Sequence, residues 1–356
     1  MRIGILAEPR SWYFRDLRRA ARERGHHTAP VDFGSIVAAV GPDGTDVSIA
    51  CGTSEDAESP DSLGSTETAA SPDPSGHAAP DGSAQRLATT TGHTPRGDAR
   101  PHRVGAIPQR TCDALIVRVM PPASLEQVVF RMDALAAFEA AGSIVLNPPK
   151  SIEAAVDKFL TTYRLGAAGL PVPRTIVCEN EDDAWAAWQA LGGRAVVKPL
   201  FGSEGRGILL VSDEEMAYRV FRTLDRLQAV LYLQEFIEHS GYDTRVLVLD
   251  GRILGSMTRH NPHDFRTNVA RRGLARPCSC SDEQAELAVR SAAVVGARFA
   301  GVDLLTDRSG RHLVIEVNAV PGWKAFSRVV GLDVARRVIM ALENTPARTA
   351  ERDQQS

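Results

Sequence analysis

Apolar runs and amphipathic stretches alternate along the first 150 residues, outside one long polar segment. Five elements are predicted in chain order: a strand over 2–7, a helix over 11–24, a strand over 112–118, a helix over 124–141 and a strand over 144–146. Single strands that alternate with helices are typical of an open α/β layer. We therefore expect residues 1–40 and 104–149 to form one such layer, in which the strand at 112–118 pairs in parallel with the first strand.

The polar segment between these parts, residues 41–103, differs from the rest in composition. It contains no Phe, Trp or Tyr, and its only sizeable aliphatic residues are Val47, Ile49, Leu63 and Leu87. A segment of this kind buries too little apolar surface to offset the entropy lost on ordering. We expect a disordered insertion within the α/β layer, tolerated as a surface loop, with a role as a binding element as the alternative.

Beyond residue 150 the pattern changes to many short strands. Helices are predicted over 151–168, 182–191, 213–227 and 282–299, and strands over 175–178, 195–198, 208–211, 231–237, 243–249, 252–257, 302–305 and 313–317. Consecutive short strands favour antiparallel pairing, so this half is predicted to be α+β. The fold class of the whole chain is α/β plus α+β.

Length, charge and hydropathy narrow the class of protein. A chain of 356 residues suggests two or three packed domains. With 41 Lys and Arg against 44 Asp and Glu, the net charge of -3 provides no overall basic field for nucleic acid or an anionic membrane. The N-terminal apolar run is too short for a signal peptide, and no stretch approaches the ~20 apolar residues of a membrane span. We expect a cytoplasmic protein with neither nucleic acid nor a membrane as partner.

A glycine-rich loop lies between two predicted strands. The segment KPLFGSEGRG runs from Lys198 to Gly207 and has glycines at 202, 205 and 207. It lacks the Gly-Lys-Ser/Thr end of a P-loop. It also lacks the helix that directly follows the glycines in a dinucleotide fingerprint. A glycine-rich turn between antiparallel strands is instead suited to close over phosphates with its backbone N–H groups, and Lys198 would add charge there. The alternative is an ordinary flexible hairpin.

Carboxylates gather on a second predicted hairpin, formed by residues 301–305 and 312–318. If the hairpin is symmetric, Asp303 lies opposite Glu316 and residue 305 opposite residue 314, and Asn318 shares the face of Glu316. Two carboxylates and an amide on one face repel unless a hard cation lies among them, and these donors suit Mg²⁺ rather than Zn²⁺. Because we expect the cluster to face a solvent-filled cleft, Asp303→Asn should abolish turnover with a modest effect on folding. A solvated hairpin face is the alternative.

Two further groups of residues lie between these motifs. Residues 234–237, Gln-Glu-Phe-Ile, have the composition of a segment that holds an adenine base through backbone groups and apolar walls. Arg259, Arg266 and Asn268 offer donors to negative charge that develops on a transferring phosphoryl group or an acyl phosphate. Each arginine taken singly is more typical of a surface charge, so the prediction depends on the group.

The order of these motifs resembles the ATP-grasp superfamily and, within it, the RimK-type α-L-glutamate ligases. The resemblance rests on Lys158, Lys198 with its glycine-rich flap, Gln-Glu-Phe-Ile at 234–237, Asp-Thr-Arg at 243–245, Phe-Arg-Thr-Asn at 265–268, Gly-Val-Asp at 301–303 and Glu-Val-Asn at 316–318. It extends over residues 151–342. It implies the ATP-grasp fold, with ATP and Mg²⁺ as cofactors and Mn²⁺ as an alternative metal.

The resemblance also implies domain boundaries. We expect an N-terminal α/β domain over 1–150 that contains the insertion 41–103, a central lid subdomain over 151–233, a C-terminal subdomain with the metal site over 234–342, and a disordered tail over 343–356. The first of these corresponds to the domain that usually precedes an ATP-grasp domain. The oligomeric state is not readable from the sequence, and a homo-oligomer is compatible with it.

Individual residues take roles by the same resemblance. The residues implied to bind the ATP phosphates are Lys158, Lys198, Ser203, Glu204, Gly205, Arg206 and Gly207. Those implied to surround adenine and ribose are Gln234, Glu235, Phe236, Ile237 and, for the ribose, Asp243. The implied metal ligands are Asp303, Glu316 and Asn318, and the implied catalytic residues are Arg245, Arg266 and Asn268, which would orient the acyl phosphate and the incoming substrate.

The implied reaction joins a carboxylate to an amine. ATP phosphorylates the carboxylate of a small acceptor, and the amino group of L-glutamate attacks the acyl phosphate to form an amide. Catalysis of this kind depends on positioning and charge neutralisation. Residues 120–122, 128–135, 147–149 and 320–323 resemble the branch that adds glutamate to tetrahydromethanopterin-type pterin cofactors more than the branch that modifies a ribosomal protein. Trp323 either stacks on a planar acceptor or belongs to the core.

Three alternatives stay open. A ligase of this type would add glutamate to a protein C-terminus instead of a cofactor. A non-catalytic nucleotide-binding module is a second reading, against which the intact lysines and metal-binding residues argue. A kinase-like phosphotransferase would share the flap and the metal site, but it needs a general base for a hydroxyl acceptor, and the sequence identifies none.

Overall fold

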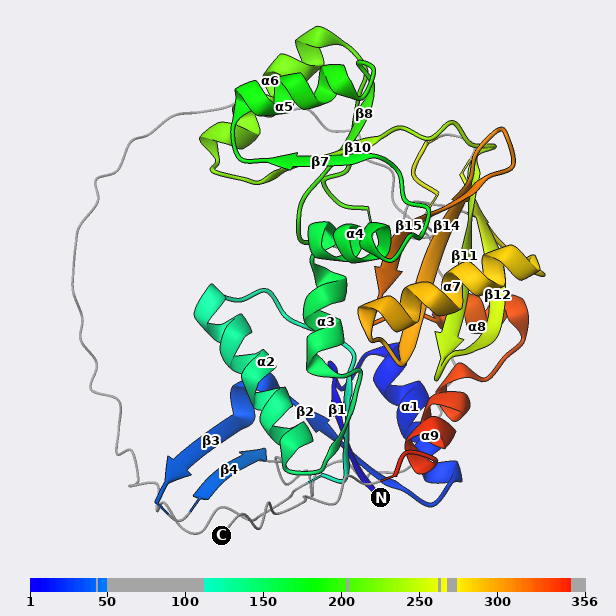
Figure 1. Ribbon diagram of the computed structural model, residues 1–356. Coiled ribbons are helices and arrows are strands. Elements are labelled where there is room, and N and C mark those ends of the chain that lie inside the picture. The colour runs from blue at the N-terminus through cyan, green and yellow to red at the C-terminus, as the bar shows by residue number, and fades with distance from the viewer. Residues whose placement is uncertain (43, 50–111, 203–204, 262–263, 268–273, 347–356) are drawn as a thin grey trace, which may run out of the picture. The chain divides into compact units, whose positions relative to one another are not determined.

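The computed structural model describes residues 1–42, 44–49, 112–202, 205–261, 264–267 and 274–346 (Figure 1). Within these residues the strands form three larger sheets and one separate hairpin. No helix of the described residues has both the length and the apolar character that crossing a membrane requires. Of the predicted disordered tail over 343–356, Glu343 is the last residue of helix α9 (Val334–Glu343) and forms an ion pair with Arg24, whereas residues 347–356 lie outside the described residues. The predicted domain boundaries remain predictions.

An all-parallel sheet is formed by the N-terminal part of the chain. Its strands lie in the order β2 (His27–Val31), β1 (Arg2–Leu6), β5 (Ala114–Val117) and β6 (Ile144–Leu146). The predicted parallel pairing of the first strand with the strand at 112–118 is confirmed. Strand β2 is an addition to the predicted elements, since Thr28 and Pro30 interrupt its apolar pattern. The accompanying helices, α1 (Trp12–Glu23) and α2 (Leu125–Ala140), each begin at a serine that caps the first turn.

A separate antiparallel hairpin follows β2. It consists of β3 (Ile36–Gly41) and β4 (Gly44–Ile49), and a 3-10 turn, η1 (Phe33–Ser35), precedes it. The prediction that disorder begins at residue 41 is therefore wrong for 41, 42 and 44–49. Ile49 is 2% exposed and belongs to the same apolar cluster as Phe33 and Ile36, so an adjacent strand lets a sparse apolar pattern form structure. Residues 43 and 50–103 of the predicted insertion lie outside the described residues.

The second sheet is antiparallel. Its strands lie in the order β7 (Thr175–Cys178), β10 (Leu231–Glu235), β8 (Ala195–Lys198) and β9 (Leu209–Val211). Helices α5 (Glu181–Ala190) and α6 (Glu214–Arg226) bury Trp188 and Phe221 against this sheet. These elements match the predicted ones within two residues at each end. The antiparallel pairing of β8 with β9 confirms that the glycine-rich segment joins two antiparallel strands.

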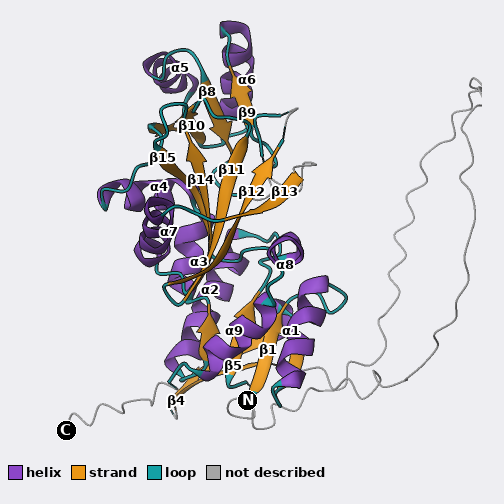
Figure 2. Ribbon diagram, turned by 90° about the vertical axis from the view of Figure 1, so that its right-hand side faces the viewer, coloured by secondary structure: helices purple, strands orange, loops and turns teal. Residues whose placement is uncertain are grey.

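The third sheet is also antiparallel and has five strands. Their order is β13 (Leu274–Cys278), β12 (Arg252–His260), β11 (Tyr242–Leu249), β14 (Phe299–Thr306) and β15 (His312–Asn318). Figure 2 shows the neighbouring strands β11, β12 and β14 side by side. Helix α7 (Asp282–Val295) packs on one face through Leu287, Ala288 and Ala292. The prediction of an antiparallel α+β second half is confirmed.

Two helices replace the single one predicted over 151–168. Helix α3 (Pro149–Val156) ends at Asp157, whose ψ of 105° is extended, and α4 (Lys158–Ala167) begins directly after it. The Asp157 carboxylate accepts a hydrogen bond of 2.9 Å from the Leu160 N–H, so it caps the second helix. The break places Lys158 at the first position of α4.

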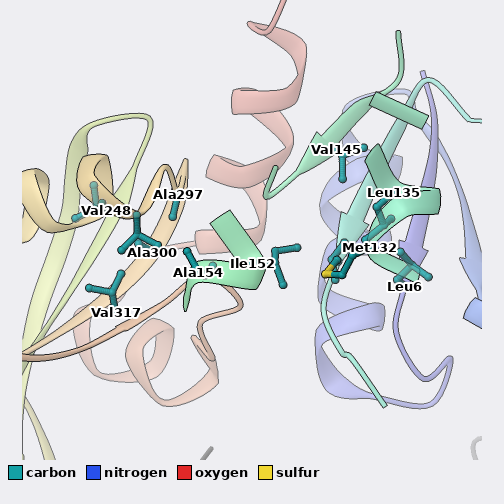
Figure 3. Packing of buried hydrophobic residues seen from close by; sticks show 14 of the residues in the cluster. Leu6, Met132, Leu135, Val145, Ile152, Ala154, Val248, Ala297, Ala300 and Val317 are labelled. Carbon is teal, nitrogen blue, oxygen red and sulfur yellow. The ribbon is translucent and has the colours of Figure 1, made fainter. Parts of the chain in front are cut away.

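Apolar residues from the first and third sheets belong to one buried cluster (Figure 3). Ile152 and Ala154 of α3 join this cluster together with Leu6 of β1 and Val317 of β15. The last helix, α9 (Val334–Glu343), packs with α1 in a second cluster, and α8 (Lys324–Val330) precedes it. The chain after β15 therefore returns to the N-terminal sheet.

A buried amide fixes the end of β6 to the third sheet. Asn147 accepts a hydrogen bond of 2.8 Å from the Phe299 N–H and donates one of 2.6 Å to the Phe299 carbonyl. Its amide also donates to the carbonyl of Ala319, the residue that follows Asn318. Because Asn147 is 2% exposed, these bonds hold the first residue of β14 and the end of β15 in place.

Candidate active site

A row of charged residues crosses three adjacent strands of the third sheet. Arg245 of β11 pairs with Asp303 of β14, and Asp303 pairs with Glu316 of β15. The predicted position of Asp303 opposite Glu316 is confirmed. The predicted pairing of residue 305 with residue 314 is wrong, because a bulge after Asp303 shifts the register so that Leu304 faces Val314.

Asp303 is buried and bound by two arginines. Its carboxylate accepts two hydrogen bonds of 2.7 Å from Arg245, and Arg259 lies 2.9 Å from one of its oxygens. Burial alone would raise the pKa of Asp303, but the charges of Arg245 and Arg259 outweigh burial and hold the pKa below its ordinary value. Asp303 is 2% exposed, so the prediction that it faces a solvent-filled cleft is wrong.

Asp243 belongs to the same buried network. Arg259 donates to its two oxygens at 2.7 and 2.5 Å, and the Thr267 hydroxyl donates to one of them. Burial would lower the pKa of Arg259, but the nearby charges of Asp303 and Asp243 raise it well above its ordinary value. The contacts of Asp243 favour a structural role, and its implied contact with the ribose stays a prediction.

Glu316 and Asn318 complete the face that carries Asp303. Within the described residues Glu316 makes no ion pair, and no three His, Cys, Asp or Glu side chains gather as metal ligands. The protein would therefore supply Mg²⁺ with two carboxylates and one amide, leaving other positions to phosphate and water. The Asn318 side-chain nitrogen is buried without a hydrogen-bond partner. Rotating the side-chain amide by 180° exchanges its nitrogen and oxygen, so the oxygen would then occupy the position of the nitrogen. These oxygen donors fit Mg²⁺.

Lys198 lies in the neighbourhood of the carboxylates. Its ammonium donates a hydrogen bond of 2.6 Å to the side-chain oxygen of Gln234. Burial lowers the pKa of Lys198 to about 8, while the charges of Glu316 and Asp303 act in the opposite direction and Lys158 adds to the lowering. The structure thus brings both predicted lysines and two predicted metal ligands within electrostatic reach of one another.

Two predicted cations hold the glycine-rich flap through its backbone. Lys158 donates a hydrogen bond of 2.8 Å to the Gly202 carbonyl, and burial lowers its pKa. Arg266 donates one of 3.1 Å to the Ile208 carbonyl and forms an ion pair of 2.6 Å with Asp264, which raises its pKa. Gly207 has a φ of 71°, which favours glycine at the end of the flap.

The four residues of the predicted adenine segment differ in their contacts. Gln234 is buried and donates to the Thr175 and Tyr232 hydroxyls, so its side chain is held within the second sheet. Glu235 accepts a hydrogen bond of 3.2 Å from the Arg174 N–H. Phe236 lies under the Arg194 guanidinium at 3.9 Å, and Ile237 is buried. The role of this segment in adenine binding stays a prediction.

The remaining predicted site residues lie in or beside parts of the chain outside the description. Ser203, Glu204 and Asn268 are outside the described residues. Gly205 and Arg206 lie in a described turn that leads to Gly207. The phosphate-binding and catalytic roles of these residues stay predictions.

Several contacts that support the site are not predicted from the sequence. The predicted role of Arg259 as a donor to a phosphoryl group does not include its pairing with two aspartates, which depends on three strands. A close approach favours glycine at 301, because a Cβ there would lie 3.0 Å from the Pro321 Cβ. Asn147 belongs to the segment 147–149 that resembles the pterin branch, but its contacts lie 152 and 172 residues away and no local pattern indicates them.

Trp323 belongs to the core. It is 0% exposed, its indole nitrogen donates a hydrogen bond of 3.0 Å to Asp16, and its ring contacts Tyr13 and Phe299. A buried ring with these contacts has no face for a planar acceptor. Of the two interpretations of Trp323, the structural one is correct.

Cations beside a glycine-rich hairpin and oxygen donors on a neighbouring antiparallel sheet form the arrangement that ATP-dependent ligases with the ATP-grasp fold use. A family model described as a RimK-like ATP-grasp domain matches residues 155–342, more than half of the chain. The chain therefore belongs to the RimK-like ATP-grasp family, and it is an enzyme of the ligase class.

Comparisons with individual proteins agree with this family. The chain is 33% identical over 270 residues to tetrahydromethanopterin:alpha-L-glutamate ligase of Methanosarcina acetivorans, across 68% of this chain and 83% of the relative. It is 34% identical over 200 residues to a probable alpha-L-glutamate ligase of Mannheimia succiniciproducens, across 56% of this chain and 67% of the relative. The solved structure of ATP-grasp ligase PsnB with minimal precursor, Mg and ADP has a TM-score of 0.63 at 18% identity, across 96% of this chain and 97% of PsnB. This last similarity shows the fold.

Proposed function

We propose that this protein is an ADP-forming α-L-glutamate ligase that acts on a carboxylate of a tetrahydromethanopterin-type pterin. The observation that carries the proposal is the row of Arg245, Asp303 and Glu316 within electrostatic reach of Lys198. Such a site offers positive charge to phosphates and oxygen donors to a dication. Relatives named as glutamate ligases, at about one third identity, support the choice of amino acid.

The reaction needs positive charge at two stages. In the first, a carboxylate oxygen of the acceptor attacks the γ-phosphorus of ATP, and ADP leaves. In the second, the amine of L-glutamate attacks the acyl carbon, phosphate leaves, and the amine loses a proton to form the amide. Lys158 and Lys198 would hold the phosphates through both stages.

The other site residues hold the reacting groups in place. Arg266, beside the flap, would face the phosphoryl group that is transferred, with Asn268 as the second donor. Arg245 and Arg259 keep Asp303 ionised and fixed in position. When bound to Asp303, Glu316 and Asn318, Mg²⁺ would neutralise phosphate charge.

The choice of acceptor depends on the relatives and on the loops after β5 and β15. A relative named for tetrahydromethanopterin covers 68% of this chain. Residues 120–122 and 320–323 are similar to the pterin branch in sequence. The alternative acceptor within the ligase class is a protein C-terminus, which the same site chemistry would serve.

The test is ADP release by the purified protein with ATP, Mg²⁺ and L-glutamate. Separate reactions contain a tetrahydropterin carboxylate, a ribosomal-protein C-terminal peptide, or no acceptor. We expect ADP only with the pterin, together with a product heavier by one glutamyl residue in the mass spectrum. Turnover with the peptide alone would assign the protein-modifying branch. ADP release that continues beyond one equivalent per enzyme without glutamate would contradict the choice of amino acid.

A further inference from the structure

Arg118 lies at the topological switch point of the N-terminal sheet. The strand order is β2-β1-β5-β6, so β1 and β5 are the two central strands. From the end of β1 the chain continues to β2 on one side of the sheet, and from the end of β5 it continues to β6 on the other side. Arg118 directly follows β5, and its N–H donates a hydrogen bond of 3.0 Å to the Leu6 carbonyl at the end of β1. Open α/β sheets bind their ligands at the carboxyl ends of strands at this point.

The Arg118 side chain is partly buried, and its guanidinium is incompletely bonded. It lies 4.3 Å from the Trp323 ring centre and 4.9 Å from that of Tyr13, and it donates a hydrogen bond of 2.7 Å to the Pro321 carbonyl. Its Nε is buried without a hydrogen-bond partner, and it makes no ion pair with the described residues. Burial lowers the pKa of Arg118 to about 10. An anion beside the guanidinium would accept a hydrogen bond from the Nε–H and would offset the cost of burying the positive charge.

The site lies close to the charged row of the third sheet. Pro321, which accepts the hydrogen bond from Arg118, also packs against Gly301, where an added Cβ would lie 3.0 Å from the Pro321 Cβ. The same added atom would lie 3.7 Å from the Arg245 Nε. A single residue, Pro321, therefore separates the surroundings of Arg118 from those of Arg245 and Asp303.

We propose that Arg118 binds a carboxylate group of one of the two substrates, a group other than the one that is phosphorylated. The inference rests on the proposed ligase function and adds the substrate class: at least one substrate carries a second carboxylate beside its reacting group. A guanidinium presents paired N–H donors that match a carboxylate. The group belongs either to L-glutamate or to the acceptor, and the experiment distinguishes these sources.

Arg222 of α6 provides a control. Like Arg118, its guanidinium lies over an aromatic ring, that of Tyr218 at 5.4 Å from the ring centre, and it also donates a hydrogen bond to the Tyr218 hydroxyl. Unlike Arg118, it has no buried nitrogen without a partner, and it lies on a helix of the second sheet, away from the loops after β5 and β15. Arg222→Met should therefore leave substrate affinity unchanged.

The experiment measures steady-state kinetics of Arg118→Met, Arg118→Lys and Arg222→Met with each substrate varied in turn. Removing one charge-assisted contact should raise the KM of one substrate by about tenfold or more in Arg118→Met. A rise for L-glutamate alone assigns its carboxylate, and a rise for the acceptor alone assigns the acceptor carboxylate. A fall in kcat with both KM values unchanged and a lower melting temperature would show a packing residue and overturn the proposal. Arg118→Lys keeps the charge and serves as the folded variant if Arg118→Met does not fold.

A binding measurement separates failure of this inference from failure of the proposed function. Calorimetry with a non-hydrolysable ATP analogue and Mg²⁺ present compares the affinities of wild type and the two Arg118 variants for L-glutamate and for the tetrahydropterin carboxylate, and needs no turnover. If wild type binds either ligand about tenfold more tightly than Arg118→Met does, the result supports binding of a substrate carboxylate by Arg118. Equal binding by all variants, or no binding by wild type, would overturn it.

Discussion

The lysines and the arginines of the site lie near the same carboxylates, but only the arginines form ion pairs with them. Arg245 and Arg259 form ion pairs with Asp303 and Asp243, with distances of 2.5 to 2.9 Å. Lys158 and Lys198 instead donate to neutral oxygens, a backbone carbonyl and the Gln234 amide. The pKa of each lysine is lowered, while the pKa of Arg259 is raised.

This difference separates two kinds of cation in one site. The arginines have their counter-ions within the protein, so their removal should lower the free energy of unfolding. Among the described residues the lysines have no such partners, so they are suited to phosphates that arrive with the nucleotide. Their removal should lower nucleotide affinity.

Arg259→Met should destabilise the protein most. It leaves two buried carboxylates, Asp243 and Asp303, without their shared partner, and breaking a buried pair in this way costs about 3–5 kcal/mol. The measurement is the midpoint of guanidinium unfolding. Arg219→Met is the control, because Arg219 forms an exposed ion pair with Glu215 along α6 and should cost about 1 kcal/mol or less. Equal losses in the two variants would contradict the structural role of Arg259.

Lys198→Met should weaken ATP without weakening the fold. Loss of one charge-assisted contact with phosphate should lower kcat/KM for ATP by about 100-fold. The free energy of unfolding should stay the same or rise, because a buried ammonium without a counter-ion is removed. Lys150→Met, at an exposed lysine paired with Glu153, is the control and should leave both quantities unchanged. A large loss of stability in Lys198→Met with normal ATP kinetics would reverse the assignment.

Glu316→Gln should raise the Mg²⁺ concentration needed for half-maximal activity by about tenfold or more, since it removes one of two charged oxygen ligands. Glu316 has no arginine partner among the described residues, so the unfolding midpoint should change little. Asp303→Asn, by contrast, should lose stability as well as activity, because Asp303 is bound by two arginines. If both variants have wild-type stability, the distinction between the two carboxylates fails.

The pH dependence should follow Lys198. Its pKa of about 8 lies below the ordinary value, so raising the pH through about 8 removes its charge in the free enzyme. kcat/KM for ATP should therefore fall above pH 8, and Lys198→Arg should flatten this fall, because arginine stays protonated. The sign for stability is opposite: above pH 8 the unfolded chain binds more protons at this residue, so its contribution to stability rises with pH. A profile that is the same in both proteins would assign the titration to another group.

The sequence predicts the fold well where the pattern is local. Three of the four strands of the N-terminal layer, β1, β5 and β6, and the antiparallel second half follow from apolar periodicity and turn residues. The position of Asp303 opposite Glu316 follows from counting along one hairpin. The bulge after Asp303 escapes such counting because it depends on packing of both strands. The break at Asp157 was hidden in a continuous helical pattern, since only the capping bond shows where the second helix begins.

The site is predictable in its residue types but not in its pairings. Carboxylates, lysines and glycines at the observed spacing indicate phosphate and metal chemistry. Burial of Asp303 and its bonds to Arg245 and Arg259 depend on neighbouring strands, so exposure was predicted wrongly. Arg118 and Asn147 act through residues more than 150 positions away, and no local pattern reports such contacts.

The most direct test of the account is to trap the acyl phosphate with hydroxylamine. The reaction contains ATP, Mg²⁺ and the tetrahydropterin carboxylate without glutamate, and the acyl hydroxamate is quantified by mass spectrometry for wild type, Lys198→Met and Lys150→Met. The account predicts hydroxamate with wild type and Lys150→Met and a loss of about 100-fold with Lys198→Met. ADP formation without hydroxamate in wild type, or equal hydroxamate in all three proteins, would contradict it.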